Sequence, residues 1–287
     1  YSETVASNCW SQMKGTLIVG HMSRRCYWGV NFNRDIPSEK DAASHFDDFR
    51  QNRHKKKLLD YRRKYGWVSK DSQDYQTRLA IYNSFWEEVR KSGDYVVLIH
   101  RLFSRVKACP TILDVTAFHR FMDQKIKRGA LKKAVKEVNS KYFEWLQKVE
   151  REYKSVIYLE EERVVNNLIR VYGTFNPEKF EIEFRDNFVK DLQAIKRFCH
   201  KEVFEELKSN FTPQNFLSAA RSALDNSGIP RITVEQVYRG TLSRGPRKQL
   251  EPTTEKRIIQ FEPTTFMNFR YPHETAEIIC DIIRMVE

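Results

Sequence analysis

Hydrophobic positions along the chain recur mostly with the spacing of amphipathic helices, and this pattern is most regular in the middle. From Leu131 to Gly173 they follow steps of three or four residues, which predicts one very long helix or two consecutive ones. Asn176 and Pro177 then resemble a helix N-cap and first turn, and a further stripe predicts a long helix to residue 210. Because the connection is short, we expect a long antiparallel helical hairpin.

Shorter amphipathic helices are expected around this hairpin. Their predicted positions are 38–64, 74–91, 213–227, a short helix capped by residues 233–236, and the C-terminal segment 278–286. The helix over 213–227 and the capped helix after it have the outline of a helix-turn-helix. The isoleucine band of the C-terminal helix is expected to pack in the core, because an exposed band of this kind promotes aggregation.

Signals for β-structure are fewer. Residues 16–32 predict a β-hairpin, residues 257–261 predict a strand, and residues 95–106 fit either a strand or a helix. The predicted fold class is therefore mainly α: a long antiparallel helical hairpin with shorter helices, plus a small N-terminal α/β region with a β-hairpin. We divide the chain into a basic α/β region over 1–108 and a helical domain over 109–287, because charge clusters and aromatic residues dominate the first part.

Positive charge is concentrated in two segments. Residues 50–64 carry eight Lys or Arg and one acid, and residues 125–136 carry six and no acid. Charges this dense repel one another unless a polyanion or an acidic partner neutralises them. The candidate nucleic-acid-binding residues are Arg50, Arg53, Lys55, Lys56, Lys57, Arg62, Arg63, Lys64, Lys125, Lys127, Arg128, Lys132 and Lys133. Tyr61, Tyr65 and Trp67 offer faces for stacking on unpaired bases, and we favour RNA over DNA.

Other interpretations of residues 50–64 stay open: a solvated helix face, a nuclear-import-like cluster, or contact with an acidic protein or lipid surface. For residues 125–136, a purely structural role without an anionic partner also stays open. The composition, with 40% apolar and 31% charged residues and a net charge of +12, allows a packed core and favours anionic partners. Five scattered cysteines without a CxxC pair favour an intracellular, reducing compartment and leave the mitochondrial matrix and the nucleus open. No apolar run approaches the roughly 20 residues of a transmembrane helix.

Motifs that carry chemistry are missing from the sequence. No nucleotide-binding, hydrolase, metalloprotease or EF-hand motif occurs, so we expect no catalytic residue, no metal site and no cofactor. Cys9, His21 and Cys26 are grouped, but their spacing fits no standard zinc pattern. The acidic run 160–162 is expected on a solvated helix face, because adjacent helical residues point in different directions.

A local spacing is formed by Tyr61, Tyr65, Asp74, Arg78, Ile81, Tyr82 and Val89. It is similar to the interrupted helical signature of the inhibitory propeptide of papain-like proteases. The signature's two asparagine positions hold Phe85 and Gly93, and no protease domain follows. We carry no function over from this resemblance.

The sequence predicts a non-enzymatic, basic, nucleic-acid-contacting protein, a component of a larger ribonucleoprotein assembly with protein partners. The first alternative is a structural or scaffold subunit whose basic surface meets acidic proteins or membrane phosphates. The second alternative is a helical enzyme whose site is assembled from distant residues.

Overall fold

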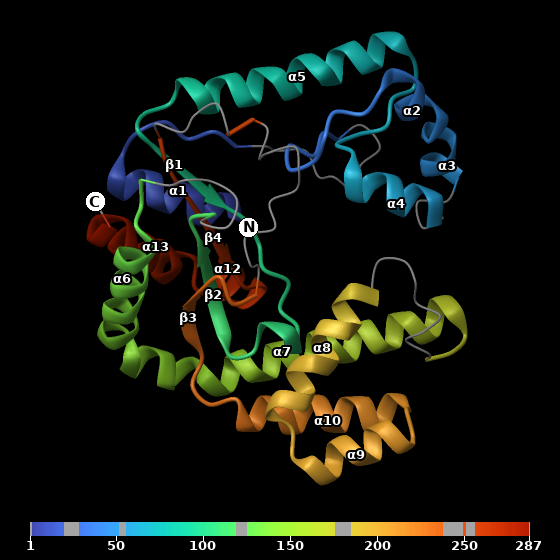
Figure 1. The fold of residues 1–287 in the computed structure, drawn as a ribbon, viewed down its shortest axis with the longest axis vertical. Helices are drawn as coiled ribbons and strands as arrows, with labels where there is room; N and C mark the ends of the chain where they lie inside the picture. The colour runs from blue at the N-terminus through green and yellow to red at the C-terminus, as the bar shows by residue number, and fades with distance from the viewer. Residues whose placement is uncertain are drawn as a thin grey trace.

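Helices make up most of the computed structural model and surround one small sheet (Figure 1). The structure describes residues 2–19, 29–51, 56–118, 125–175, 185–237, 249–250 and 256–286. This arrangement confirms the predicted class, mainly α with a smaller α/β part.

Four strands form the sheet: β1 (Tyr95–Ile99), β2 (Thr111–Thr116), β3 (Arg231–Val234) and β4 (Arg257–Pro263). Their order across the sheet is β1-β4-β2-β3. β1 runs parallel to β4 and β2 parallel to β3, whereas the two central strands are antiparallel. The predicted strand at 257–261 is therefore confirmed, and residues 95–106 begin with a strand.

One face of the sheet is apolar and packs against helices from both ends of the chain. Val115, Ile232, Ile259 and Phe261 occupy this face at alternate strand positions. They share a core with α1 (Ser2–Met13), α6 (Arg128–Lys141) and α13 (Pro272–Val286). Figure 1 shows these three helices gathered on one side of the strands.

The C-terminal helix α13 places its isoleucines in this core, as predicted. Ile278, Ile279, Ile282 and Ile283 are each at most 1% exposed. Their spacing sets them on one face of the helix, which contacts α1, α6 and α12 (Thr265–Arg270). Burying a side chain of this size stabilises the fold by about 1.5–3 kcal/mol.

On the opposite face of the sheet, the part that lies beneath α5 (Ser72–Lys91) is apolar. The predicted stripe of α5 is buried at Tyr75, Tyr82, Trp86 and Val89. These side chains share a second core with residues of β1 and β4. Asp71 caps the helix, because its carboxylate accepts the Asp74 N–H. The predicted helix at 74–91 is confirmed, beginning two residues earlier.

The single helix predicted over 38–64 is wrong. The chain forms α2 (Glu39–Ser44), α3 (Phe46–Gln51) and α4 (Lys56–Lys64), and residues 52–55 lie outside the described part. A straight helix would hold Phe46 and Leu58 about 18 Å apart. The bends bring both into one small core, formed by Phe46, Phe49, Leu58, Tyr61 and Val68.

Of the two arrangements expected from Leu131 onward, the structure has the two consecutive helices, α6 and α7 (Phe143–Tyr172), which meet at Tyr142. The break lets the Tyr142 hydroxyl donate to Asp281 of α13 at 2.9 Å. The single long helix predicted to residue 210 is wrong: α8 (Arg185–Phe198) ends, and α9 (Lys201–Ser209) begins after its N-cap His200. α10 (Pro213–Asn226) follows and starts at the Thr212 cap. Asn176 and Pro177 lie outside the described residues.

The predicted helix at 233–236 is also wrong, and with it the helix-turn-helix. Thr233 and Val234 belong to β3, and the Glu235 N–H donates to the Val115 carbonyl of β2. The Thr233 hydroxyl donates to the Asp114 carboxylate instead of capping a helix. That same carboxylate accepts the Gln236 N–H, the group that a cap would have satisfied.

The remaining expectations fall partly outside the described residues. Residues 16–19 and 29–32 are not strands, and residues 20–28 of the predicted β-hairpin are not described. The sheet takes β1 from before residue 108 and its other strands from after it, and the division there stays a prediction. Of the helices in the described ranges, none combines the length and apolarity that crossing a membrane requires.

Candidate functional site

The predicted basic residues of the first segment lie on the outside of α3 and α4. We call Arg50, Lys57, Arg62, Arg63 and Lys64 the α4 surface. Arg62 is half-buried with its guanidinium 4.8 Å from the Phe49 ring, and the other four are exposed. Lys56 belongs to α4 without a described side chain, and Arg53 and Lys55 lie outside the described residues.

The aromatic residues beside the α4 surface are not free for base stacking, which corrects the sequence interpretation. Tyr61 and Trp67 are 7% and 3% exposed. The Tyr61 hydroxyl donates to the Trp67 carbonyl at 2.6 Å, and its ring stacks on His45. Burial raises the pKa of Tyr61. Tyr65 is half-buried, so what this surface offers a nucleic acid is chiefly positive charge.

The second basic segment covers the first turns of α6. We call Lys125, Lys127, Arg128, Lys132, Lys133 and Lys136 the α6 surface. All six side chains are exposed, while Ile126, Leu131, Ala134 and Val135 between them are buried. Lys127 is the N-cap, and no side-chain cap is found among the described residues. The N-terminal N–H groups of α6 therefore add positive potential to that of the cations.

The two basic surfaces do not merge. Figure 1 shows α4 and α6 on opposite sides of the molecule, with the sheet between them. One member of the α6 surface reaches the sheet: the Arg128 guanidinium lies 3.1 Å from the Glu235 carboxylate, which is itself buried.

The face of the sheet that α5 partly covers is polar outside the covered part. The sequence analysis did not predict this polar surface. Asp114 lies opposite Glu262, and Thr116 opposite Gln260, in the register of β2 and β4. All four are at most 6% exposed. Alternation of apolar and polar residues along β4 was the available signal, but the sequence does not show which face of a strand is covered.

Two contacts define the chemistry of this polar face. His100 follows β1, and its Nδ1 lies 3.3 Å from Glu262 Oε1, which also accepts from the Gln260 amide. The His100 side chain is 26% exposed, so one buried carboxylate orients an accessible imidazole, an arrangement suited to proton transfer. Glu235 accepts the Thr116 hydroxyl at 3.2 Å and has a positive φ of 54°. The described residues hold no group of His, Cys, Asp or Glu suited to a metal ion.

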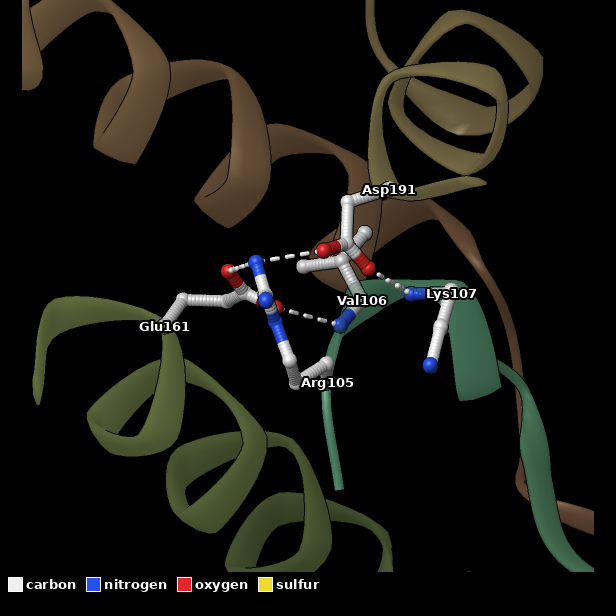
Figure 2. Close-up of polar contacts among 5 residues, drawn as sticks. All are labelled: Arg105, Val106, Lys107, Glu161 and Asp191. Atoms are coloured by element: carbon white, nitrogen blue, oxygen red, sulfur yellow. Dashed lines mark hydrogen bonds and ion pairs between the residues drawn. The ribbon is translucent and has the colours of Figure 1, made fainter. Parts of the chain in front are cut away.

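A separate cluster of charged side chains lies between helices, where the short 3-10 helix η1 (Val106–Ala108) meets α7 and α8 (Figure 2). Arg105 donates to both oxygens of Glu161 at 2.9 Å and forms an ion pair with Asp191. Glu161 also accepts the Val106 N–H, and Asp191 accepts the Lys107 N–H, both at 2.9 Å. The side chains of Arg105, Glu161 and Asp191 are 0% exposed.

This arrangement corrects the expectation that the acidic run 160–162 is solvated, because Glu161 points inward to Arg105. Burial within this cluster also shifts the pKa values of two of its members. Burial first, and the Glu161 carboxylate second, raise the pKa of Asp191 to about 7. Burial lowers the pKa of Lys107 to about 8. Figure 2 shows the Lys107 ammonium directed away from Asp191. We interpret the group as a structural clamp that joins η1, α7 and α8.

Comparison with known proteins finds no match: no family model, no curated protein and no solved structure matches the chain.

Proposed function

We propose that the protein binds the phosphate backbone of a nucleic acid through the α6 surface, with the α4 surface as a second contact. The single observation that carries this proposal is the α6 surface itself. Six exposed cations lie at the start of a helix for which the described residues provide no side-chain cap, while Ile126, Leu131, Ala134 and Val135 between them belong to the core. Lysine and arginine side chains on adjacent turns release counterions when they meet successive phosphates.

We still favour RNA over DNA. The argument from base stacking no longer applies, and the placement of the two basic surfaces takes its place. The two basic surfaces lie on opposite sides of the molecule. A flexible single strand or a folded RNA can reach both, whereas duplex DNA is stiff over about 150 base pairs. A protein that binds RNA on two sides fits a component of a larger ribonucleoprotein assembly. Cys9, Cys109, Cys199 and Cys280 are free thiols in the structure, which fits a reducing compartment.

The test is binding of a fluorescently labelled single-stranded RNA, followed by anisotropy, with two matched triple variants. Lys132→Ala, Lys133→Ala and Lys136→Ala together remove half of the α6 surface. Lys148→Ala, Arg151→Ala and Lys201→Ala remove three exposed cations from α7 and α9. The proposal expects the first variant to bind at least about tenfold more weakly and the second to bind within about twofold of the native chain. Equal losses in both variants would show that only net charge matters and would overturn the assignment to α6.

A further inference from the structure

Two buried cysteines meet where the first helix packs against the last. Cys9 in α1 is 7% exposed and Cys280 in α13 is 0% exposed. The Cys9 sulfur lies 3.8 Å from the Ala276 carbonyl oxygen. Ala276 and Cys280 are four residues apart on α13, so the Cys9 sulfur lies against the turn that carries Cys280. Cys9 and Cys280 also belong to the same buried core, where α1 packs on α13.

This contact makes the two thiols chemically unequal. The neighbouring Cys9 thiol lowers the pKa of Cys280, and the same proximity, with burial, raises the pKa of Cys9. Cys280 is therefore the first of the pair to ionise. Because the thiolate is the reactive form of cysteine, oxidation should begin at Cys280.

We propose that Cys9 and Cys280 form a redox-controlled cross-link between α1 and α13. With a peroxide as the oxidant, the Cys280 thiolate attacks one peroxide oxygen, giving a sulfenic acid and releasing hydroxide. The Cys9 sulfur then attacks the Cys280 sulfur, its proton leaves, and the sulfenic oxygen departs as water. Overall, two thiols and one hydrogen peroxide give one disulfide and two waters, and a dithiol reductant reverses the change.

The position of α1 allows the oxidant to reach the two sulfurs, and it determines what the cross-link does to the fold. Val5 and Cys9 are the buried residues among the described residues of α1, so a local opening of this helix exposes both sulfurs. The cross-link closes nearly the whole chain into one loop, which restricts the unfolded state strongly. It also fixes α13, which packs on α6, the helix that carries the α6 surface.

The experiment treats the fully reduced, full-length protein with equimolar hydrogen peroxide and maps its thiols by mass spectrometry. We expect one peptide pair linking Cys9 to Cys280 and the loss of two hydrogen atoms from the intact mass. Cys199 is the matched control, because its half-buried thiol is more accessible than either partner. The oxidised chain should melt roughly 10 °C higher than the reduced chain, and a dithiol reductant should remove the shift.

Two variants separate the pair from general oxidation. Cys199→Ser should cross-link as the native chain does. Cys9→Ser should show no cross-link and should leave Cys280 as a sulfenic acid that dimedone traps. Oxidation of Cys199 while Cys9 and Cys280 stay reduced would overturn the proposal. So would a Cys9–Cys280 disulfide that leaves the melting temperature unchanged, since the cross-link would then control nothing. Peptide mapping of the native chain decides the first point even if a variant folds poorly.

Discussion

Arg105 and Glu161 form a fully buried, two-pronged ion pair in which Nε donates to Oε1 and Nη2 to Oε2, each at 2.9 Å. Neither side chain has any exposed area. The pair fixes the segment between β1 and β2 against α7, and Asp191 extends the contact to α8. The planar guanidinium suits this geometry, because its donors match the two carboxylate oxygens.

Replacing Arg105 should therefore cost far more than replacing an exposed arginine. Arg105→Met leaves Glu161 and Asp191 as buried carboxylates without their cation, and we expect a loss of about 3–5 kcal/mol of unfolding free energy. Arg163→Met removes an arginine that is 61% exposed and pairs with Glu160 on the same helix, and we expect less than about 1 kcal/mol. Urea unfolding of both variants measures the difference, and similar losses would show that Arg105 is not a clamp.

Asp191 gives the clamp a pH dependence. Its pKa is raised in the folded chain to about 7, so the folded state holds its proton more tightly than the unfolded state. The associated stability is complete below the unfolded pKa, near 4, and is lost as pH rises through about 7. The variant Asp191→Asn has no carboxyl group at this position, so it should not lose this stability as pH rises.

The melting temperature of Asp191→Asn, relative to the native chain, should therefore rise from about pH 5 to about pH 8. Melting curves of both proteins across this range provide the measurement. A difference that stays constant with pH would contradict a raised pKa at Asp191.

Helical stripes were predictable, because the repeat within one helix shows which of its sides is buried, whatever packs against it. The residues of α13 and α5 repeat every three or four positions, and both helices bury those residues. Features decided by distant partners were not. Glu161 looks like part of a solvated acidic run, and only Arg105, 56 positions away, turns it inward. Thr233 has a helix-capping pattern that a neighbouring strand overrides through Asp114.

The candidate site, too, was predictable from the sequence only in part. The basic character of residues 50–64 and 125–136 can be read directly, and exposure of the described cations agrees with it. Burial of Tyr61 and Trp67 could not be predicted, because it depends on how three short helices bend around a small core. The polar face of the sheet requires strands separated by well over 100 residues, from β2 to β4.

The isoleucine band of α13 provides a test of the core. Ile282 is 0% exposed, so Ile282→Ala should lower the unfolding free energy by about 2–5 kcal/mol. Met285, one turn away, is 42% exposed, and Met285→Ala should change it by no more than about 0.5 kcal/mol. Equal effects at the two positions would place the band at the surface.

Tyr61 distinguishes a core role from a stacking role. Tyr61→Phe keeps the ring and removes the hydroxyl that donates to the Trp67 carbonyl. We expect a loss of about 1 kcal/mol of stability and unchanged affinity for single-stranded RNA. Weaker RNA binding by a variant that unfolds at the native temperature would restore Tyr61 as a contact residue.

The central claim is that cations of the α6 surface contact nucleic-acid phosphates, and the salt dependence of RNA binding tests it most directly. For single strands, each neutralised phosphate contributes about −0.7 to the slope of log K against log salt. The native chain should give a steep negative slope. The triple variant at Lys132, Lys133 and Lys136 should reduce its magnitude by about 2, and the α7 and α9 control variant should leave it unchanged. A native slope near zero, or an α6 variant with the native slope, would contradict the claim.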